Sequence, residues 1–269
     1  MFPKLKTIFA EKEQLLKFDI IHAFWLNEAT SFAIKLGKKL NIPVIATAMG
    51  QDVLKQNGWL KKMDFSFLSE IIMLSKFHQN EAKKSSVENS RVIHFGIEAF
   101  LESVPNKIYD FIAIGNLIPL KQFDYFIDVL AEVKKQAPGF RAIVIGDGIE
   151  RKALTDRIQK NGLEENIELC GLLSYADTME MLASSKVLIH PSKYESFGMI
   201  FIEALNLQTH VLASQVGLAM EEEQIHKLQF DVKHDAELAL RLLEQPKPKQ
   251  KVYEIKETVK AYLEIYNRF

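Results

Sequence analysis

The chain has 269 residues, with 34 lysines and arginines against 35 aspartates and glutamates, and Cys170 is its single cysteine. Apolar residues make up 48% and charged residues 26% of the sequence, which is typical of a globular protein and argues against intrinsic disorder. One cysteine excludes an internal disulfide framework, and a net charge of −1 gives no general attraction to nucleic acid.

Short apolar runs alternate with amphipathic stretches along the chain. The apolar runs predict strands over residues 19–24, 43–48, 70–74, 91–95, 110–115, 141–146, 166–170, 186–190 and 209–213. Helices are predicted from the cap Asn27 to Leu40, over 122–135, and from the cap Ser174 over 175–185. Strands without clean alternation that are separated by helices indicate a parallel sheet covered on both faces. The predicted fold class is therefore α/β.

Two breaks divide the chain. The segment 101–108 has few apolar residues and a central proline, and 245–251 is rich in proline and lysine. These breaks predict a first domain over 1–104, a second over 105–248, and a final helix over 249–269. This helix presents one apolar face and needs a partner. Docking on a domain is the simpler interpretation, and a basic membrane-binding face is the alternative.

Most candidate motifs are incomplete. Gly146-Asp-Gly148 follows a strand, but Arg151 stands where a dinucleotide-binding fingerprint needs its third glycine, so a tight turn is the better interpretation. The histidines and the one cysteine lack the spacing of a metal site. His22 lies in an apolar strand and is interpreted first as a structural residue, while His78 is interpreted as a surface residue.

One set of residues keeps a chemical interpretation. After the strand that ends at His190, a polar loop leads through Glu195 to Gly198, where an apolar helix that contains Glu203 begins. The free N–H groups and dipole of a helix N-terminus favour an anion, and a carboxylate on an apolar helix needs hydrogen-bond donors. A phosphorylated sugar would satisfy both. The alternative is that Glu195 is solvated and Glu203 lies on an exposed flank.

The same residues resemble the family-four retaining glycosyltransferases of the GT-B fold. The signature of that family is two glutamates separated by seven residues, with Pro-Ser before the first and Phe-Gly after it, and here it is Pro191-Ser192, Glu195, Phe197-Gly198 and Glu203. The loop 115–121 resembles the strand-end loop of the family that carries a lysine. The resemblance is good over residues 110–215 and looser over 19–97. The helix predicted over 249–269 resembles the last helix of the family, which implies that it packs back on the first domain.

The resemblance implies roles for individual residues. Lys121 would contact the donor diphosphate, and backbone N–H groups at Ser196, Phe197 and Gly198 would hold the phosphates or the sugar. Glu195 would bind hydroxyls of the donor sugar, and Glu203 those of the ribose, so Lys121 and Glu195 are the predicted catalytic residues. The base would lie near Gly171 and Leu172. No metal and no cofactor are implied beyond the nucleotide-diphosphate sugar, which is the donor substrate.

Three positions depart from the family pattern. Asn116 replaces the usual arginine and Gln122 the glycine after the lysine. In the first domain Met49-Gly50 replaces a frequent His-Gly pair, while Asp52 is kept. The candidate binding residues still include Gly50, Asp52, Asn116 and His22.

The implied function is transfer of a hexosyl group, with retention and without a metal, to a glycan or lipid-linked acceptor in polysaccharide biosynthesis. The expected location is the cytoplasm, with peripheral contact at the inner face of the membrane left open, and nucleic acid is not expected as a partner. Two alternatives remain. One is a non-catalytic or partner-completed sugar-nucleotide-binding module, and the other is a different GT-B chemistry such as epimerisation or phosphorolysis.

The chain is short for a GT-B enzyme, which has two comparable halves. Four strands are predicted before the linker, and the expected opening strand with its glycine-rich turn is absent. A charged, helix-like stretch stands at 4–17 instead. The first domain is therefore expected to be truncated, with an open sheet edge that this stretch or another copy of the chain could cover.

Overall fold

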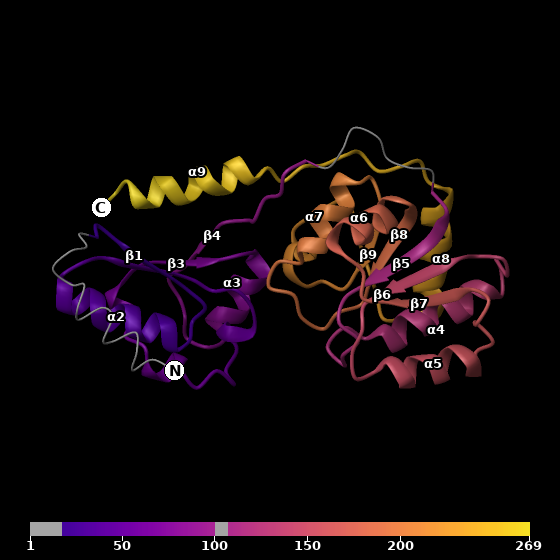
Figure 1. Ribbon diagram of the computed structural model, residues 1–269, viewed down its shortest axis with the longest axis horizontal. Coiled ribbons are helices and arrows are strands. Elements are labelled where there is room, and N and C mark those ends of the chain that lie inside the picture. Colours follow the sequence, from indigo (N-terminus) through magenta and orange to yellow (C-terminus); the bar gives the residue numbers. More distant parts are fainter. Residues whose placement is uncertain (1–17, 100–106) are drawn as a thin grey trace. The chain divides into compact units, whose positions relative to one another are not determined.

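A computed structural model describes residues 18–99 and 107–269 (Figure 1). The charged stretch at 4–17 and most of the predicted linker at 101–108 lie outside these residues. The chain divides into two units, and each is discontinuous in sequence. The first comprises the described residues up to Met73, Glu81–Arg91 and Ala261–Phe269, and the second comprises Leu74–Asn80 and the described part of Val92–Lys260.

The first unit contains a four-stranded sheet in the order β1-β2-β3-β4. Its strands are β1 (Ile21–Phe24), β2 (Val44–Thr47), β3 (Leu68–Met73) and β4 (Arg91–Val92), and β2 pairs in parallel with both β1 and β3. Helix α2 (Glu28–Leu40) follows β1, and the side chain of its cap Asn27 accepts the N–H of Ala29 at 2.8 Å, as the sequence predicts. The other helical segments here are η1 (Gln51–Val53), η2 (Leu60–Lys62), η3 (Phe65–Phe67) and α3 (Lys76–Lys83), which runs from the second unit into the first.

The second unit contains a six-stranded parallel sheet in the order β10-β9-β8-β5-β6-β7. The strands are β5 (Tyr109–Ile114), β6 (Ala142–Ile145), β7 (Ile167–Gly171), β8 (Ser185–His190), β9 (His210–Ala213) and β10 (Ile225–Lys227). The chain runs outward from β5 to β7 and then returns to the other side of β5 with β8. The carboxyl ends of β5 and β8 therefore meet at a topological switch point, which is where open α/β sheets bind ligands.

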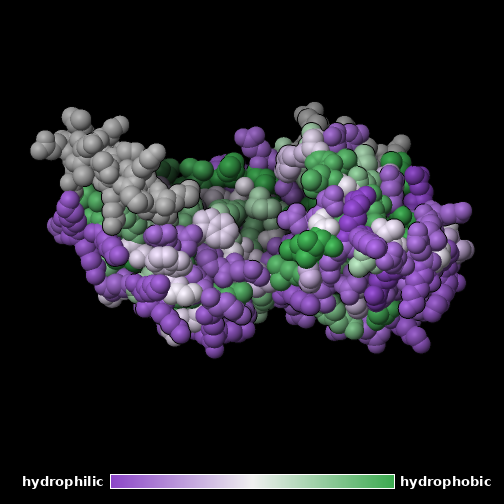
Figure 2. Space-filling view, turned by 60° about the horizontal axis from the view of Figure 1, so that its bottom comes forward, coloured by the Kyte–Doolittle hydropathy of each residue, from purple (hydrophilic) through white to green (hydrophobic). Residues whose placement is uncertain are grey.

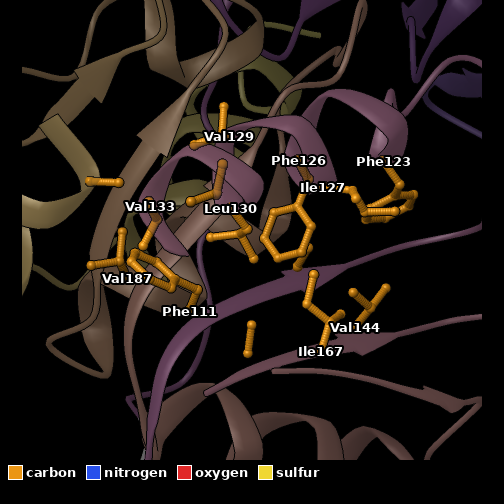
Figure 3. Close-up of a cluster of buried hydrophobic side chains, with 14 of the residues drawn as sticks. Phe111, Phe123, Phe126, Ile127, Val129, Leu130, Val133, Val144, Ile167 and Val187 are labelled. Atoms are coloured by element: carbon orange, nitrogen blue, oxygen red, sulfur yellow. The ribbon is translucent and has the colours of Figure 1, made fainter. Parts of the chain in front are cut away.

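Helices cover both faces of this sheet (Figure 1). Helices α4 (Phe123–Lys134), α5 (Arg151–Lys160) and α8 (Val232–Glu244) lie on one face, and α6 (Tyr175–Ala183) and α7 (Met199–Asn206) on the other. Successive strand residues point to opposite faces, so Phe111 packs with Phe126 of α4 (Figure 3), whereas Ile112 packs with Phe201 of α7. Both faces are buried, and the predicted α/β class with parallel sheets is confirmed.

The nine predicted strands are all present, with differences at their ends. The strand predicted over 91–95 ends at Val92, because the side chain of His94 lies against Glu221 instead. The three-residue strand β10 was not predicted, since Ile225 is its only large apolar residue. Ser174 caps α6 as predicted, and its hydroxyl accepts the N–H of Asp177 at 3.1 Å.

The last helix is α9 (Ile255–Tyr266). Ile265 near its end is buried, whereas Ile255 and Val259 are about half exposed. Polar side chains cover much of the surface in Figure 2, and apolar patches interrupt them. In the part of the chain that the structure describes, no helix is long and apolar enough to cross a membrane.

Candidate functional site

The loops that follow β5 and β8 bring two predicted site residues together. Ser192 and Lys193 hold the two loops against each other, because the Lys193 N–H donates to the carbonyl of Leu120 at 2.8 Å and the Ser192 hydroxyl donates to the same carbonyl at 3.3 Å. Lys121 and Glu195, which are 74 positions apart, form an ion pair there. The switch point of the sheet thus places the predicted lysine beside the predicted carboxylate.

Glu195 accepts two hydrogen bonds on one oxygen, Oε1. One donor is Lys121 Nζ, and the other is Nε2 of the buried His190, the last residue of β8, at 2.7 Å. Burial alone would raise the pKa of Glu195, but His190 and Lys121 outweigh it and lower the pKa to about 2. Glu195 is therefore ionised at neutral pH, and the interpretation of a solvated side chain is wrong. His190 precedes the glutamate motif directly, but the sequence alone indicates no role for it.

Gly198 begins α7 in a conformation that favours glycine. Its φ is 84°, and a Cβ atom there would lie 2.5 Å from the ring of Phe201. Two carbonyl groups of the loop before Gly198 accept hydrogen bonds from other parts of the second unit. The Leu218 N–H donates to the carbonyl oxygen of Phe197 at 2.7 Å, and the Ser75 hydroxyl donates to that of Ser196 at 2.6 Å. The first N–H groups of α7 lack helical partners, as at any helix N-terminus. Glu195 lies three positions before Gly198, so this loop presents these N–H groups near the Lys121–Glu195 pair.

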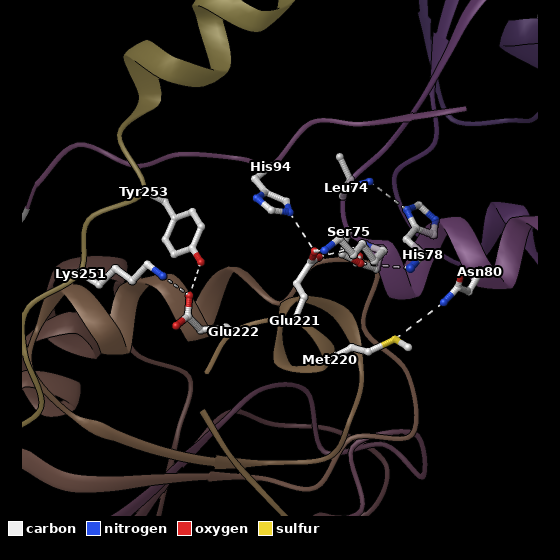
Figure 4. Close-up of polar contacts among 12 residues, drawn as sticks. Leu74, Ser75, His78, Asn80, His94, Met220, Glu221, Glu222, Lys251 and Tyr253 are labelled. Atoms are coloured by element: carbon white, nitrogen blue, oxygen red, sulfur yellow. Dashed lines mark hydrogen bonds and ion pairs between the residues drawn. The ribbon is translucent and has the colours of Figure 1, made fainter. Parts of the chain in front are cut away.

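Ser75 was not predicted as a site residue. It is fully buried, and its hydroxyl accepts the N–H of His78 at 3.1 Å while it supports the Ser196 carbonyl (Figure 4). His78 is also fully buried, with Nδ1 3.4 Å from the N–H of Leu74, so its interpretation as a surface residue is wrong. A single sequence carries no signal for a contact between positions 75 and 196.

The glycines that directly follow β5 and β6 allow the two loops to approach each other closely. Gly146 has a φ of 139°, and a Cβ atom there would lie 1.9 Å from the carbonyl oxygen of Gly115. The adjacent loop residue Asn116 is exposed. Gln122, at the position where the family has glycine, has a φ of 50° and precedes α4. The backbone thus keeps a left-handed conformation that glycine would adopt with less strain.

Glu203 is buried on α7, with 7% of its surface exposed, so the alternative of an exposed flank is wrong. The hydroxyl of Tyr175 at the start of α6 donates to Glu203 Oε1 at 2.9 Å. Burial raises the pKa of Glu203, and the Tyr175 hydrogen bond opposes that shift. At the end of β7, Gly171 has a φ of 79° and is followed by Leu172, which is 74% exposed. An apolar residue is thus available at the position predicted for the base.

Asp52 organises a loop in the first unit. Its carboxylate accepts the N–H of Leu26 at 2.6 Å and that of Gly50 at 2.6 Å. The ring of Trp25 lies over Gly50, since a Cβ atom on Gly50 would be 3.1 Å from it. Asp52 therefore joins the loops that follow β1 and β2. These residues belong to the first unit, whereas Lys121, Glu195 and Glu203 belong to the second.

His22 has an internal partner for each ring nitrogen. Nδ1 lies 2.6 Å from the hydroxyl of Tyr266 on α9, and Nε2 lies 2.8 Å from the hydroxyl of Thr47 on β2. Thr47 in turn lies 3.1 Å from the hydroxyl of Tyr262. Burial lowers the pKa of His22 to about 4. These contacts give His22 a structural role that links β1, β2 and the end of α9.

The His22 network predicts an acid-sensitive first unit. The folded pKa of about 4 lies below the usual value of 6.5, so protons bind the unfolded chain more strongly, and stability falls as the pH drops from 6.5 to 4. A shift of this size corresponds to roughly 3.4 kcal/mol, and because His22 is partly exposed, solvent screening reduces the expected loss in the free energy of unfolding to about 2 kcal/mol. Denaturant unfolding at several pH values would show a shallower loss for His22→Gln. An equal loss in both proteins would contradict the prediction, and His234→Gln, on a half-exposed histidine, is the control.

No group of three or more His, Cys, Asp or Glu side chains within residues 18–99 and 107–269 is placed to hold a metal ion. The polar groups form two sets: Lys121 and His190 contact the Glu195 carboxylate before α7, and the Tyr175 hydroxyl contacts the Glu203 carboxylate on α7. Lysine and N–H groups suit an anion, and buried carboxylates suit hydroxyl groups.

Comparison with known proteins agrees with this geometry. Residues 99–257 match the family described as glycosyl transferases group 1. The chain is 29% identical over 206 residues to the uncharacterized glycosyltransferase MJ1178 of Methanocaldococcus jannaschii, a match that covers 74% of this chain and 56% of that protein. It is 25% identical over 252 residues to the O-antigen biosynthesis glycosyltransferase WclY of Escherichia coli, which covers 84% of this chain and 69% of WclY.

The fold is also that of solved glycosyltransferases. One of these structures is a mutant of S. aureus TarM, which was solved in complex with Fondaparinux, alpha-GlcNAc-glycerol and UDP. It superposes on this chain with a TM-score of 0.74 and a sequence identity of 16%. The match covers 96% of this chain and 58% of the TarM chain. This chain thus spans little more than half the length of MJ1178 and TarM. The family match covers more than half of the chain and includes every predicted site residue from Asn116 to Glu203. The chain belongs to the glycosyl transferases group 1 family, as its glutamate motif predicted.

Proposed function

We propose that this chain transfers a hexosyl group from a nucleotide-diphosphate sugar to a glycan or lipid-linked acceptor, with retention and without a metal ion. The observation that carries the proposal is the cluster of Lys121, Glu195 and His190 at the β5/β8 switch point, beside the N-terminus of α7. Support also comes from TarM, solved with UDP, and from WclY, named for O-antigen biosynthesis. We infer a role in polysaccharide biosynthesis for this chain as well.

The charges of the cluster suit departure of a nucleoside diphosphate. Breaking the bond between sugar and phosphate builds negative charge on the phosphate oxygens. Lys121 and the N–H groups of α7 are already fixed near that position, so they stabilise the charge without reorganisation. The acceptor hydroxyl would attack from the face that the diphosphate leaves, and its proton would pass to the departing phosphate. This route needs no separate side-chain base.

The carboxylates would hold the sugar and the nucleoside. Glu195 is ionised and tied down by His190, so it can accept hydroxyl groups of the hexose after Lys121 turns to the diphosphate. Glu203, buried on α7, would accept hydroxyl groups of the ribose. Binding of the donor would therefore exchange the internal ion pair for contacts with the ligand.

Ligand-dependent stabilisation tests the proposal. Thermal unfolding of the full chain is measured with UDP, GDP, ADP and their hexose conjugates, because a ligand that binds only the folded state raises the melting temperature. We expect one nucleotide series to stabilise the wild type, and Glu195→Gln to lose the extra shift given by the sugar. Glu180→Gln, on the exposed side of α6, is the matched control and should behave as wild type.

Product analysis separates transfer from the alternatives. We expect slow hydrolysis of the stabilising donor, and the sugar released first should carry the same anomeric configuration by NMR. Binding without hydrolysis or transfer would instead support a non-catalytic module. Absence of stabilisation by every nucleotide would overturn the proposed function.

A further inference from the structure

Tyr175 combines an exposed ring with an anchored hydroxyl. It is the first residue of α6, directly after the cap Ser174, and 59% of its surface is exposed. Its hydroxyl nevertheless reaches Glu203 Oε1 on α7, at 2.9 Å. A tyrosine that served only the fold would bury its ring, because the ring holds most of its apolar surface. Here the ring stays at the surface and the polar end points inward.

The hydroxyl changes what Glu203 can accept. An ionised carboxylate has about four lone-pair positions on its two oxygens, and Tyr175 fills one of them on Oε1. A phenol hydroxyl that donates to the carboxylate keeps its own lone pairs, so it can still accept a hydrogen bond. Tyr175 and Glu203 thus present a phenol oxygen and carboxylate oxygens side by side. Two adjacent hydroxyl groups on one ring can donate to such a pair.

Apolar side chains adjoin this pair in sequence. Leu173 is 39% exposed and Leu172 is 74% exposed, and both lie between Gly171 at the end of β7 and Ser174. Exposed leucines two and three positions before an exposed tyrosine are costly in water, and such side chains suit the flat face of a heterocycle. A nucleoside offers such a face together with a vicinal diol.

We propose that Tyr175 is a specificity-determining residue that, together with Glu203, recognises the ribose diol of the donor nucleotide. The inference rests on the proposed function, since it takes the nucleotide to bind at Glu203. The hydroxyl of Tyr175 accepts a hydrogen bond from one ribose hydroxyl and holds the Glu203 carboxylate for the other. The exposed ring forms a wall beside the nucleoside.

Isothermal titration with nucleoside diphosphates that differ only in the sugar tests this role. The nucleotide that stabilises the wild type is compared with its 2′-deoxy and 3′-deoxy analogues, in the wild type and in Tyr175→Phe. We expect the wild type to prefer the ribonucleotide over at least one analogue by roughly 10-fold. Tyr175→Phe should lose most of that preference and bind the same analogue with unchanged affinity. Glu203→Gln should weaken binding of the ribonucleotide itself.

Tyr125→Phe is the matched control. The hydroxyl of Tyr125 donates to the buried Asp235 at 2.6 Å, so the substitution removes the same kind of bond from the α4/α8 face of the sheet. It should leave the preference for ribose unchanged even if it lowers stability. If Tyr175→Phe weakens the ribonucleotide and its analogues by the same factor, the hydroxyl serves only the structure and the inference is overturned.

The two proposals fail in different ways. The role of Tyr175 is overturned if Tyr175→Phe keeps the preference for ribose while Glu203→Gln loses it. Nucleotide binding, and with it the proposed function, would then still stand. A wild type that binds no nucleotide overturns the proposed function itself.

Discussion

Replacing Lys121 with alanine is expected to lower the rate of sugar transfer by roughly 100- to 1,000-fold, the usual effect of removing one preorganised group that stabilises charge in a transition state. Lys121 is the cation that the structure pairs with Glu195 at the switch point of the second sheet. In the proposed reaction, its removal would leave only N–H groups to stabilise the charge that develops on the leaving diphosphate. The measurement is the initial rate of donor hydrolysis or transfer at saturating donor.

Lys193→Ala is the matched control for Lys121→Ala. Lys193 lies two residues before Glu195, and its side chain is exposed. Its replacement changes the net charge by the same amount as Lys121→Ala but leaves the Lys121–Glu195 ion pair in place. We expect its rate to stay within a factor of about three of the wild type, in line with the small effect of exposed charges. Circular dichroism establishes that both variants are folded. Equal rates in folded Lys121→Ala and the wild type would show that Lys121 is misassigned.

Gly146→Ala should have the largest effect on stability, a loss of about 3 kcal/mol or more in the free energy of unfolding. The new Cβ atom would lie 1.9 Å from the carbonyl oxygen of Gly115, at a φ of 139° that L side chains rarely adopt. Hydrogen bonds oppose a shift of either backbone segment. The Gly115 N–H donates to the carbonyl oxygen of Ile145 at 2.9 Å, and the Gly146 N–H donates to that of Gly171 at 2.8 Å. Denaturant unfolding would measure the loss.

The matched substitution for Gly146→Ala is Gly139→Ala. A Cβ atom at Gly139 meets nothing within 4 Å, so this change should alter stability by less than about 1 kcal/mol. Similar unfolding midpoints for the two variants would contradict the close approach of the β5 and β6 loops.

The sheets and the glutamate motif were predictable because their signals are local. Apolar runs mark β5 and β8, and Glu195 and Glu203 stand in one stretch of the sequence with the start of α7 between them. The ion pair of Lys121 with Glu195 is different. It follows from the strand order, which a single sequence does not contain, and it was not predicted. The resemblance only assigned both residues to one donor site.

The residues that were missed act at a distance along the chain. Ser75 supports Ser196 from 121 positions away, and Tyr175 reaches Glu203 from 28 positions away. Serine and tyrosine are common at surfaces, and nothing in their neighbours reveals such a contact. His78 was misassigned for the same reason, since its burial depends on residues that the local pattern does not show.

The division into units has a consequence for protein engineering. The second unit takes in Leu74–Asn80 as well as the residues from Val92 onward. From these early segments come Ser75, which supports the Ser196 carbonyl, and His94, whose Nε2 lies 3.2 Å from the Glu221 carboxylate (Figure 4). A chimera joined near residue 105, in the predicted linker, would take both residues from a different parent than Ser196 and Glu221, which they contact. Exchange of the second unit between relatives therefore requires two matched grafts, residues 74–80 and 92–260, rather than a single crossover.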